Sequence, residues 1–103
     1  MMNFEWDEEK RNTNVQKHGI DFEDVKGAFS QPLLSRVDTR QDYGEERLIG
    51  VGFMREIAVV IVYTEPDENT IRIISARKAT KHERESYHSQ IKNRLDQGHQ
   101  NEG

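Results

Sequence analysis

The residues best suited to chemistry lie in the stretch 70–87, TIRIISARKATKHERESY. Arg77 and Lys78 stand where a predicted strand ends, and Thr80 and Glu83 have the T-x-x-E spacing of a capping box, which begins a helix. The stretch therefore predicts a corner between a strand and a helix at which several N–H donors surround an anion. That anion is either a substrate phosphate or a carboxylate of the protein itself.

One reaction that such a corner could perform is cleavage of RNA by its own 2′-hydroxyl. This reaction needs a base for the hydroxyl proton, cations for the charge that develops on phosphorus, and an acid for the leaving 5′-oxygen. His18 and His82 are candidates for the base or the acid, because imidazole changes charge near neutral pH. Arg47, Arg77 and Lys78 are candidates for holding the phosphate, Arg by a bidentate fork. No metal ion is required.

Two aromatic residues are candidates for stacking on an RNA base, Tyr87 and Trp6. Both have a structural alternative. Tyr87 can belong to the hydrophobic core, and Trp6 can pack in an aromatic-rich N-terminal segment.

The charged candidates also have structural alternatives. His18 precedes a glycine and can interact with the negative end of a helix. Arg77 can pair with a carboxylate of the protein, such as Glu83 or Glu45. Glu83 is explained as a capping residue without a role as general base. Residue chemistry alone leaves these alternatives open.

Metal and nucleotide cofactors are not expected. A zincin helix needs a second histidine four residues after His82, but Ser86 stands there. His88 is six residues on, roughly 240° around a helix, so the two imidazoles cannot share a metal ion. Gly50 and Gly52 lie inside a predicted strand, whereas a dinucleotide loop joins a strand to a helix.

Hydrophobic periodicity predicts the elements that position these residues. The segment 57–63, IAVVIVY, is apolar on both faces, as expected of a central strand. Asp7 and Gly19 are the predicted caps of one helix, and Asp21 is the predicted N-cap of the next. In chain order we expect a strand at 3–6, helices at 8–18 and 22–29, strands at 33–38, 47–53, 57–64 and 70–78, and a helix from 81 to 95. This order predicts an α+β fold with an antiparallel sheet of four to five strands, two N-terminal helices and one C-terminal helix. We expect one domain at 1–95 and a disordered tail at 96–103.

Composition limits the classes of protein to consider. The 103 residues contain no cysteine, which excludes disulfides, thiolate zinc sites and cysteine nucleophiles. We expect no transmembrane segment and no signal peptide, and therefore a cytoplasmic protein. Residues 1–70 hold 8 Lys and Arg against 15 Asp and Glu, whereas residues 71–103 hold 7 against 4. The stretch 70–87 is thus a local positive region on an acidic body, which favours focused capture of an anion, unless the two halves simply pair their charges.

Three segments together resemble the BrnT family of bacterial type II toxins: FEWDEEKRNTNVQKHGIDFEDV, YGEER and IVYTEPDENTIRIISARKATKHERESY. The resemblance covers roughly residues 3–92, and its motifs are F-x-W-D, K-H-G and R-I-I-S-A-R-K-A-T. It implies a compact RelE-like fold and a metal-independent ribonuclease that arrests growth by cutting RNA. It also implies neutralisation by a BrnA-like antitoxin, which binds DNA, so that the complex represses its own operon.

The resemblance also implies site residues. In RelE-like toxins, basic residues on the sheet and an Arg and Tyr near the last strand and helix act on the phosphate. The predicted catalytic residues are Lys17, His18, Arg47, Arg77, Lys78, Arg84 and Tyr87, and the predicted substrate-binding residues are Trp6 and His82. Whether RNA is cut alone or on a ribosome stays open. The alternative is a non-catalytic module that uses the same corner only to bind a partner.

Overall fold

The structure is a computed structural model that describes residues 2–40, 42 and 44–101, without the side chains of 96–101. The elements follow the predicted order. They are β1 (Asn3–Glu5), α1 (Glu8–His18), α2 (Phe22–Val25), the 3₁₀ helix η1 (Lys26–Ser30), β2 (Leu34–Val37), β3 (Leu48–Met54), β4 (Ile57–Asp67), β5 (Thr70–Lys78) and α3 (Lys81–Asn101). The predicted α+β fold is confirmed.

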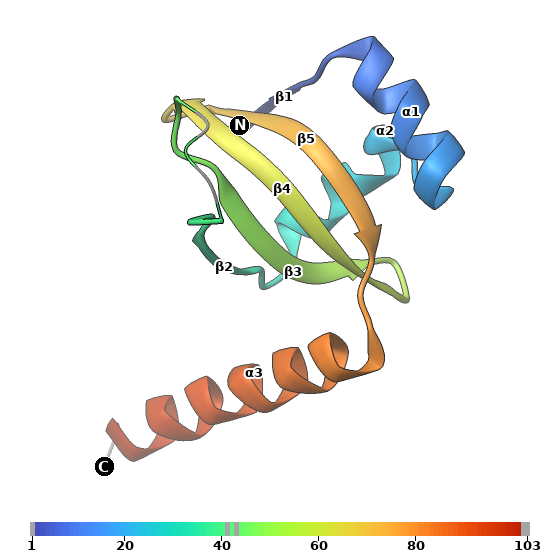
Figure 1. The fold of residues 1–103 in the computed structure, drawn as a ribbon. Coiled ribbons are helices and arrows are strands. Elements are labelled where there is room, and N and C mark those ends of the chain that lie inside the picture. Colours follow the sequence, from blue (N-terminus) through green and yellow to red (C-terminus); the bar gives the residue numbers. More distant parts are fainter. Residues whose placement is uncertain (1, 41, 43, 102–103) are drawn as a thin grey trace.

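The five strands form one sheet in the order β1-β5-β4-β3-β2 (Figure 1). Strands β2 to β5 pair antiparallel, as predicted. Strand β1 differs, because it pairs parallel with β5 and makes the sheet mixed. The N–H of Asn3 donates to the carbonyl of Asn69 at 2.7 Å, so the start of the chain is fixed beside the start of β5.

The ends of α1 agree with its predicted caps. The carboxylate of Asp7 accepts from the N–H groups of Glu9 at 2.8 Å and Lys10 at 3.2 Å. Gly19 ends the helix with φ of 69°, in the left-handed region that glycine favours. The position of His18 in the last turn is therefore set by local sequence.

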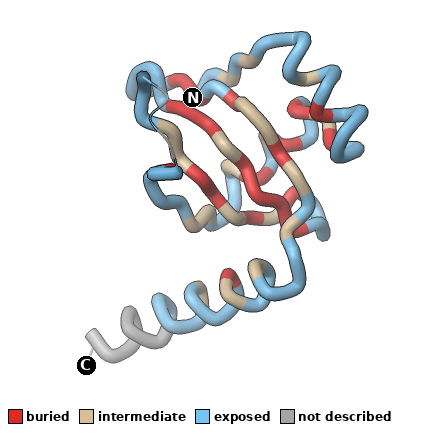
Figure 2. The backbone as a smooth tube through the Cα atoms, viewed as in Figure 1, coloured by how far each residue is buried: buried red, intermediate tan, exposed pale blue. Residues whose placement is uncertain are grey.

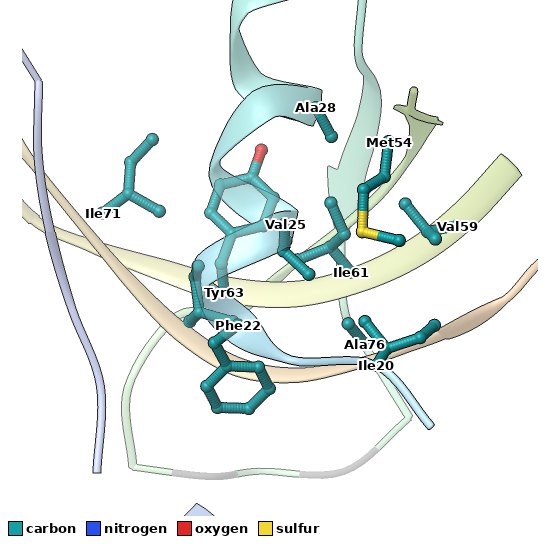
Figure 3. Packing of buried hydrophobic residues seen from close by; sticks show 11 residues of the cluster. Ile20, Phe22, Val25, Ala28, Met54, Val59, Ile61, Tyr63, Ile71 and Ala76 are labelled. Carbon is teal, nitrogen blue, oxygen red and sulfur yellow. The ribbon is translucent and has the colours of Figure 1, made fainter. Parts of the chain in front are cut away.

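One face of the sheet carries the hydrophobic core, which is covered by α2 and η1. Phe22, Val25 and Ala28 recur at helical spacing and are fully buried. They pack with Ile61 and Tyr63 of β4. Figure 3 shows further members of this cluster from β3, β4, β5 and the loop before α2, among them Ile20, Met54, Val59, Ile71 and Ala76.

The two glycines of β3 allow a close approach by the segment before β2. A Cβ at Gly52 would lie 2.6 Å from Cδ1 of Leu33, and one at Gly50 would lie 3.0 Å from Cδ2 of the same residue. The two glycines thus leave room on one face of β3, and Leu33 fills that room.

The turn between β4 and β5 is tighter than predicted. Strand β4 runs through Pro66 to Asp67, which pairs with Thr70, so the predicted turn at 65–69 is too long. The register is irregular between Thr64 and Asp67. This irregularity explains how a proline, which cannot donate to the ladder, lies inside a strand.

Helix α3 runs away from the sheet beyond the end of β5, and its tube is mostly exposed (Figures 1 and 2). Its contact with the body includes Phe53 of β3, whose ring centroid lies 5.4 Å from those of Tyr87 and His88. Further along the helix, the side chain of Leu95 is 66% exposed. The helix is thus attached near its N-terminal end.

The helix continues to Asn101, through most of the stretch predicted to be a disordered tail. Residues 102–103 and the side chains of 96–101 lie outside the described residues. The domain boundary at residue 95 stays a prediction. Among the described residues, no helix has the length and apolar character needed to cross a membrane.

Candidate active site

A pocket of about 400 Å³ lies between the sheet face opposite the core and the first turns of α3. We call it the α3 pocket. Its lining comes from residues far apart in the chain: His18, Leu34, Ser35, Arg36, Arg40, Ile49, Val51, Val60, Val62, Ser75, Ala76, Arg77, His82, Glu83, Ser86, Tyr87, Gln90 and Arg94. Valines and Ile49 form its floor, and the charged and imidazole groups surround that floor.

A bulge in β5 turns Arg77 toward this pocket. Val62 pairs with Ser75 while its neighbour Tyr63 pairs with Ile73, so Ile74 is an extra residue in the strand. Before the bulge Ile73 faces the core, whereas after it Ser75 and Arg77 line the pocket. Strict alternation would have put all three side chains on the same face.

Arg77 makes a bidentate ion pair with Glu83. Both N–H···O distances are 2.8 Å. The same carboxylate accepts from the N–H of Thr80 at 2.8 Å, and the Thr80 hydroxyl accepts from the N–H of Glu83 at 3.1 Å, which confirms the predicted capping box. Hydrogen bonds from the Arg77 guanidinium lower the pKa of Glu83 most. Burial raises this pKa, the Thr80 N–H lowers it again, and the net value is about 2. Hydrogen bonding to Glu83 raises the pKa of Arg77.

The structural alternative for Arg77 is therefore realised, although its side chain keeps 44% exposure and lines the pocket. Its partner carboxylate begins α3, so the pair also links β5 to that helix. A phosphate entering the pocket would meet a guanidinium that is already oriented.

Three arginines that the sequence interpretation missed also line the α3 pocket: Arg36, Arg40 and Arg94. Arg40 makes a bidentate pair with the buried carboxylate of Asp38, at 2.9 and 2.8 Å. Arg36 pairs in register with Ile49, a pocket residue of β3. The signal that could have indicated this placement was the i, i+2 spacing of Leu34 and Arg36, which puts both side chains on one face of β2.

The two candidate imidazoles both reach this pocket. His18 is the last residue of α1 and His82 lies in the first turn of α3, and both are exposed. The fold thus gathers four of the nine predicted site residues: His18, Arg77, His82 and Tyr87. Their individual roles stay predictions.

Tyr87 joins α3 to the body. It is 7% exposed, its hydroxyl donates to the carbonyl of Pro32 at 2.7 Å, and burial raises its pKa. Its ring packs against Phe53. The structural alternative for Tyr87 thus has direct contacts, and its edge still lines the pocket.

Two other predicted residues, Lys17 and Arg47, lie at a second pocket of about 460 Å³, which we call the α1 pocket. Its lining residues are Asp7, Glu9, Lys10, Thr13, Asn14, Lys17, His18, Arg47, Ile74 and Ser75. Arg47 directly precedes β3 and lies 3.7 Å from Glu45. Lys17 is exposed in the last turn of α1.

The position of α1 against the sheet depends on Asn14, which the sequence interpretation did not single out as structural. Among the residues of α1, all of which the structure describes, only Asn14 is buried. Its Nδ2 donates to the carbonyls of Ile20 and Ala76, both at 2.9 Å, and its Oδ1 accepts from the N–H of Ala76 at 3.0 Å. The amide thus holds His18, one turn later, beside the strand that carries Arg77.

The remaining predicted residues, Lys78, Arg84 and Trp6, line neither pocket in the described part of the chain. Lys78 and Arg84 are exposed. The Trp6 ring packs edge-on against Phe22 at 6.0 Å, and its Nε1 donates to Glu8 at 3.0 Å. These contacts agree with the structural alternative for Trp6.

The α3 pocket offers groups that donate hydrogen bonds or exchange protons. Its four arginines can hold a phosphate, and its two imidazoles can give and take protons. Among the described residues, no group of three or more His, Cys, Asp or Glu side chains could hold a metal ion. The arginines and imidazoles together fit phosphoryl chemistry.

Comparisons with known proteins agree with this chemistry. A family model described as the ribonuclease toxin BrnT of type II toxin-antitoxin systems matches residues 6–83. Among solved structures, the chain is similar to the crystal structure of the Brucella abortus ribonuclease toxin BrnT, with 30% sequence identity and a TM-score of 0.60. That similarity covers 79% of this chain and 100% of the other. No curated protein matches the chain.

Proposed function

Because the chain belongs to the BrnT family of ribonuclease toxins of type II toxin-antitoxin systems, we propose that it is an endoribonuclease that cleaves RNA in the α3 pocket. The observation that carries this proposal is the gathering of two imidazoles and four arginines in one pocket. Cleavage of cellular RNA would arrest growth.

The reaction we propose is attack of a ribose 2′-oxygen on the adjacent phosphorus. A bond forms between the 2′-oxygen and phosphorus, and the bond from phosphorus to the 5′-oxygen breaks, which leaves a 2′,3′-cyclic phosphate. One of His18 and His82 takes the 2′-hydroxyl proton, and the other gives a proton to the leaving 5′-oxygen. Arg77 and its neighbouring arginines stabilise the charge on the phosphate oxygens. Side chains alone supply these steps, so no metal ion takes part.

The partners in this proposal are RNA and an antitoxin. RNA enters free or on a ribosome, which would supply further contacts to this acidic chain. A BrnA-like antitoxin neutralises the toxin by covering the α3 pocket and binds operator DNA, so that the complex represses its own operon. Substrate, antitoxin and operator meet in the cytoplasm.

A second candidate function is a non-catalytic module that binds a partner through the same surface. Two contacts favour it: Arg77 is already paired with Glu83, and the Tyr87 hydroxyl already donates to Pro32. Both groups could then be structural, and their exposed edges would only form an interface.

Purified protein and defined RNA distinguish the two functions. We expect the wild type to cleave free RNA with EDTA present, or RNA on ribosomes in a buffer that contains Mg²⁺, and to leave cyclic phosphate ends. His18→Ala and His82→Ala should each lower the rate by about 10²–10⁴-fold, the contribution of a general acid or base. His88→Ala is the matched control, because this imidazole lines neither pocket.

The rate per folded molecule, with folding measured by thermal melting, is the quantity to compare. Intact RNA under all conditions would leave the binding module as the better account. Loss of activity only when EDTA is present would reject the metal-independent reaction but retain the ribonuclease.

A further inference from the structure

The α3 pocket and the α1 pocket are neighbouring parts of one surface. Both are lined by His18 and Ser75, so they meet at these two residues. The sheet continues beneath them, since Arg77 pairs with Val60 and Ser75 with Val62, while Arg47 precedes the residue that pairs with Tyr63. Val60 and Tyr63 are three residues apart on β4, which separates the two pockets by about 10 Å along the strand.

The α1 pocket has its own cations. Lys10 and Lys17 extend from α1 and Arg47 comes from the sheet, while Thr13 and Ser75 add neutral hydroxyl donors. Two carboxylates also line the pocket, those of Asp7 and Glu9. The carboxylate of Asp7 already accepts two N–H groups at the start of α1. Three cationic side chains thus line the pocket against two carboxylates, and this excess of positive charge attracts a second anion.

We infer that the α1 pocket is a binding subsite for a flanking phosphate of a single-stranded RNA whose cleaved phosphate lies in the α3 pocket. This inference rests on the proposed function for the position of the cleaved bond. It reassigns Lys17 and Arg47 from catalysis to binding, and it adds Lys10, which the sequence interpretation did not include.

The ligand must be a chain of nucleotides with more than one phosphate. A dinucleotide has a single internal phosphate, which the α3 pocket with its four arginines binds in preference to the α1 pocket. A longer strand places a phosphate in each pocket, so its affinity includes the cations of both. Because Lys10 and Lys17 act as point charges on an exposed helix, they bind without reading the base.

The test uses binding and does not depend on cleavage. Fluorescently labelled 2′-deoxy oligonucleotides, a dinucleotide and a hexanucleotide, lack the attacking hydroxyl and serve as probes. We expect the wild type to bind the hexanucleotide more tightly. The double variant Lys10→Ala/Lys17→Ala should weaken hexanucleotide binding by roughly tenfold and lower its salt slope by about 0.7 for each lost phosphate contact, while dinucleotide binding stays the same.

Lys92→Ala is the matched control, because it removes an exposed helical lysine that lines neither pocket. The inference is overturned if the wild type binds both lengths equally, if the double variant binds the hexanucleotide like the wild type, or if Lys92→Ala weakens binding as much. The proposed function fails in a different experiment, when the wild type binds these probes but leaves the matching RNA intact.

Discussion

Arg77 takes part in the candidate site and in the start of α3, because its guanidinium donates to both oxygens of Glu83. Sequence reasoning raised both readings of this residue and could not choose between them. The structure gives it both environments: a carboxylate partner and exposure to a pocket with other arginines. Substitution at either end of the pair therefore has different consequences.

Arg77→Ala should cost roughly 2–4 kcal/mol of transition-state stabilisation, because a hydrogen-bond donor to the RNA phosphate is lost. It should also lower the melting temperature, since Glu83 loses its partner. Glu83→Gln should lower the melting temperature and keep most of the activity, because Arg77 remains. Cleavage rates and thermal melts of both variants check this expectation. If Glu83→Gln loses as much activity as Arg77→Ala, Glu83 itself takes part in the reaction.

The Glu83 carboxyl also predicts a pH dependence. Its pKa is lowered from 4.5 to about 2, mainly by Arg77, so the folded state favours the ionised form. The stabilisation is fully present above pH 4.5 and is lost as the pH falls toward 2. We expect the free energy of unfolding to decrease across this window in the wild type, and to decrease less in Glu83→Gln. Denaturant unfolding at a series of pH values measures this free energy. Identical pH curves for the wild type and Glu83→Gln would contradict the assignment of the pH dependence to Glu83.

At the scale of elements, α1 is held to β5 by one buried amide. Helix caps at both ends of α1 could be predicted because they depend on neighbours in the sequence. The Asn14 contacts could not, because two of its three hydrogen bonds reach Ala76, 62 residues away. The polar side chain of Asn14 gives no local sign of burial, yet the residue is only 4% exposed.

Asn14→Ala should destabilise the protein by about 1–3 kcal/mol, because buried backbone groups of Ile20 and Ala76 lose their partner. Asn12→Ala, an exposed change in the same helix, should stay within about 0.5 kcal/mol of the wild type. Chemical denaturation measures both. Equal effects of the two substitutions would mean that α1 is held mainly by other contacts.

The packing of Leu33 on β3 gives a second element-scale prediction. Gly52→Ala should destabilise by about 1–3 kcal/mol, because the new methyl group would lie 2.6 Å from Leu33. Gly27→Ala is the matched control, since a Cβ there would meet no described atom within 4 Å. Melting temperatures of the two variants compare them directly. A neutral Gly52→Ala would show that Leu33 moves aside easily.

At the scale of the whole molecule, the order of elements and the core face followed from sequence, because periodicity and caps are local signals. The site followed only in part. His18 and His82 come from opposite ends of the chain, and Arg36, Arg40 and Arg94 join them through sheet register and helix direction. Such placement depends on strand order and on the path of α3, neither of which a pattern of residue types specifies.

The bulge at Ile74 has a consequence for how this chain tolerates changes of length. Side chains alternate along a strand, and the extra residue lets Ile73 face the core while Ser75 and Arg77 line the α3 pocket. Deletion of Ile74 itself would leave a strand of regular alternation, with Ile73 and Ser75 still on opposite faces. Deletion of Ala76, with the bulge kept in place, would instead turn Arg77 to the core face. The tolerance of β5 for the loss of one residue thus depends on where the loss falls relative to the bulge.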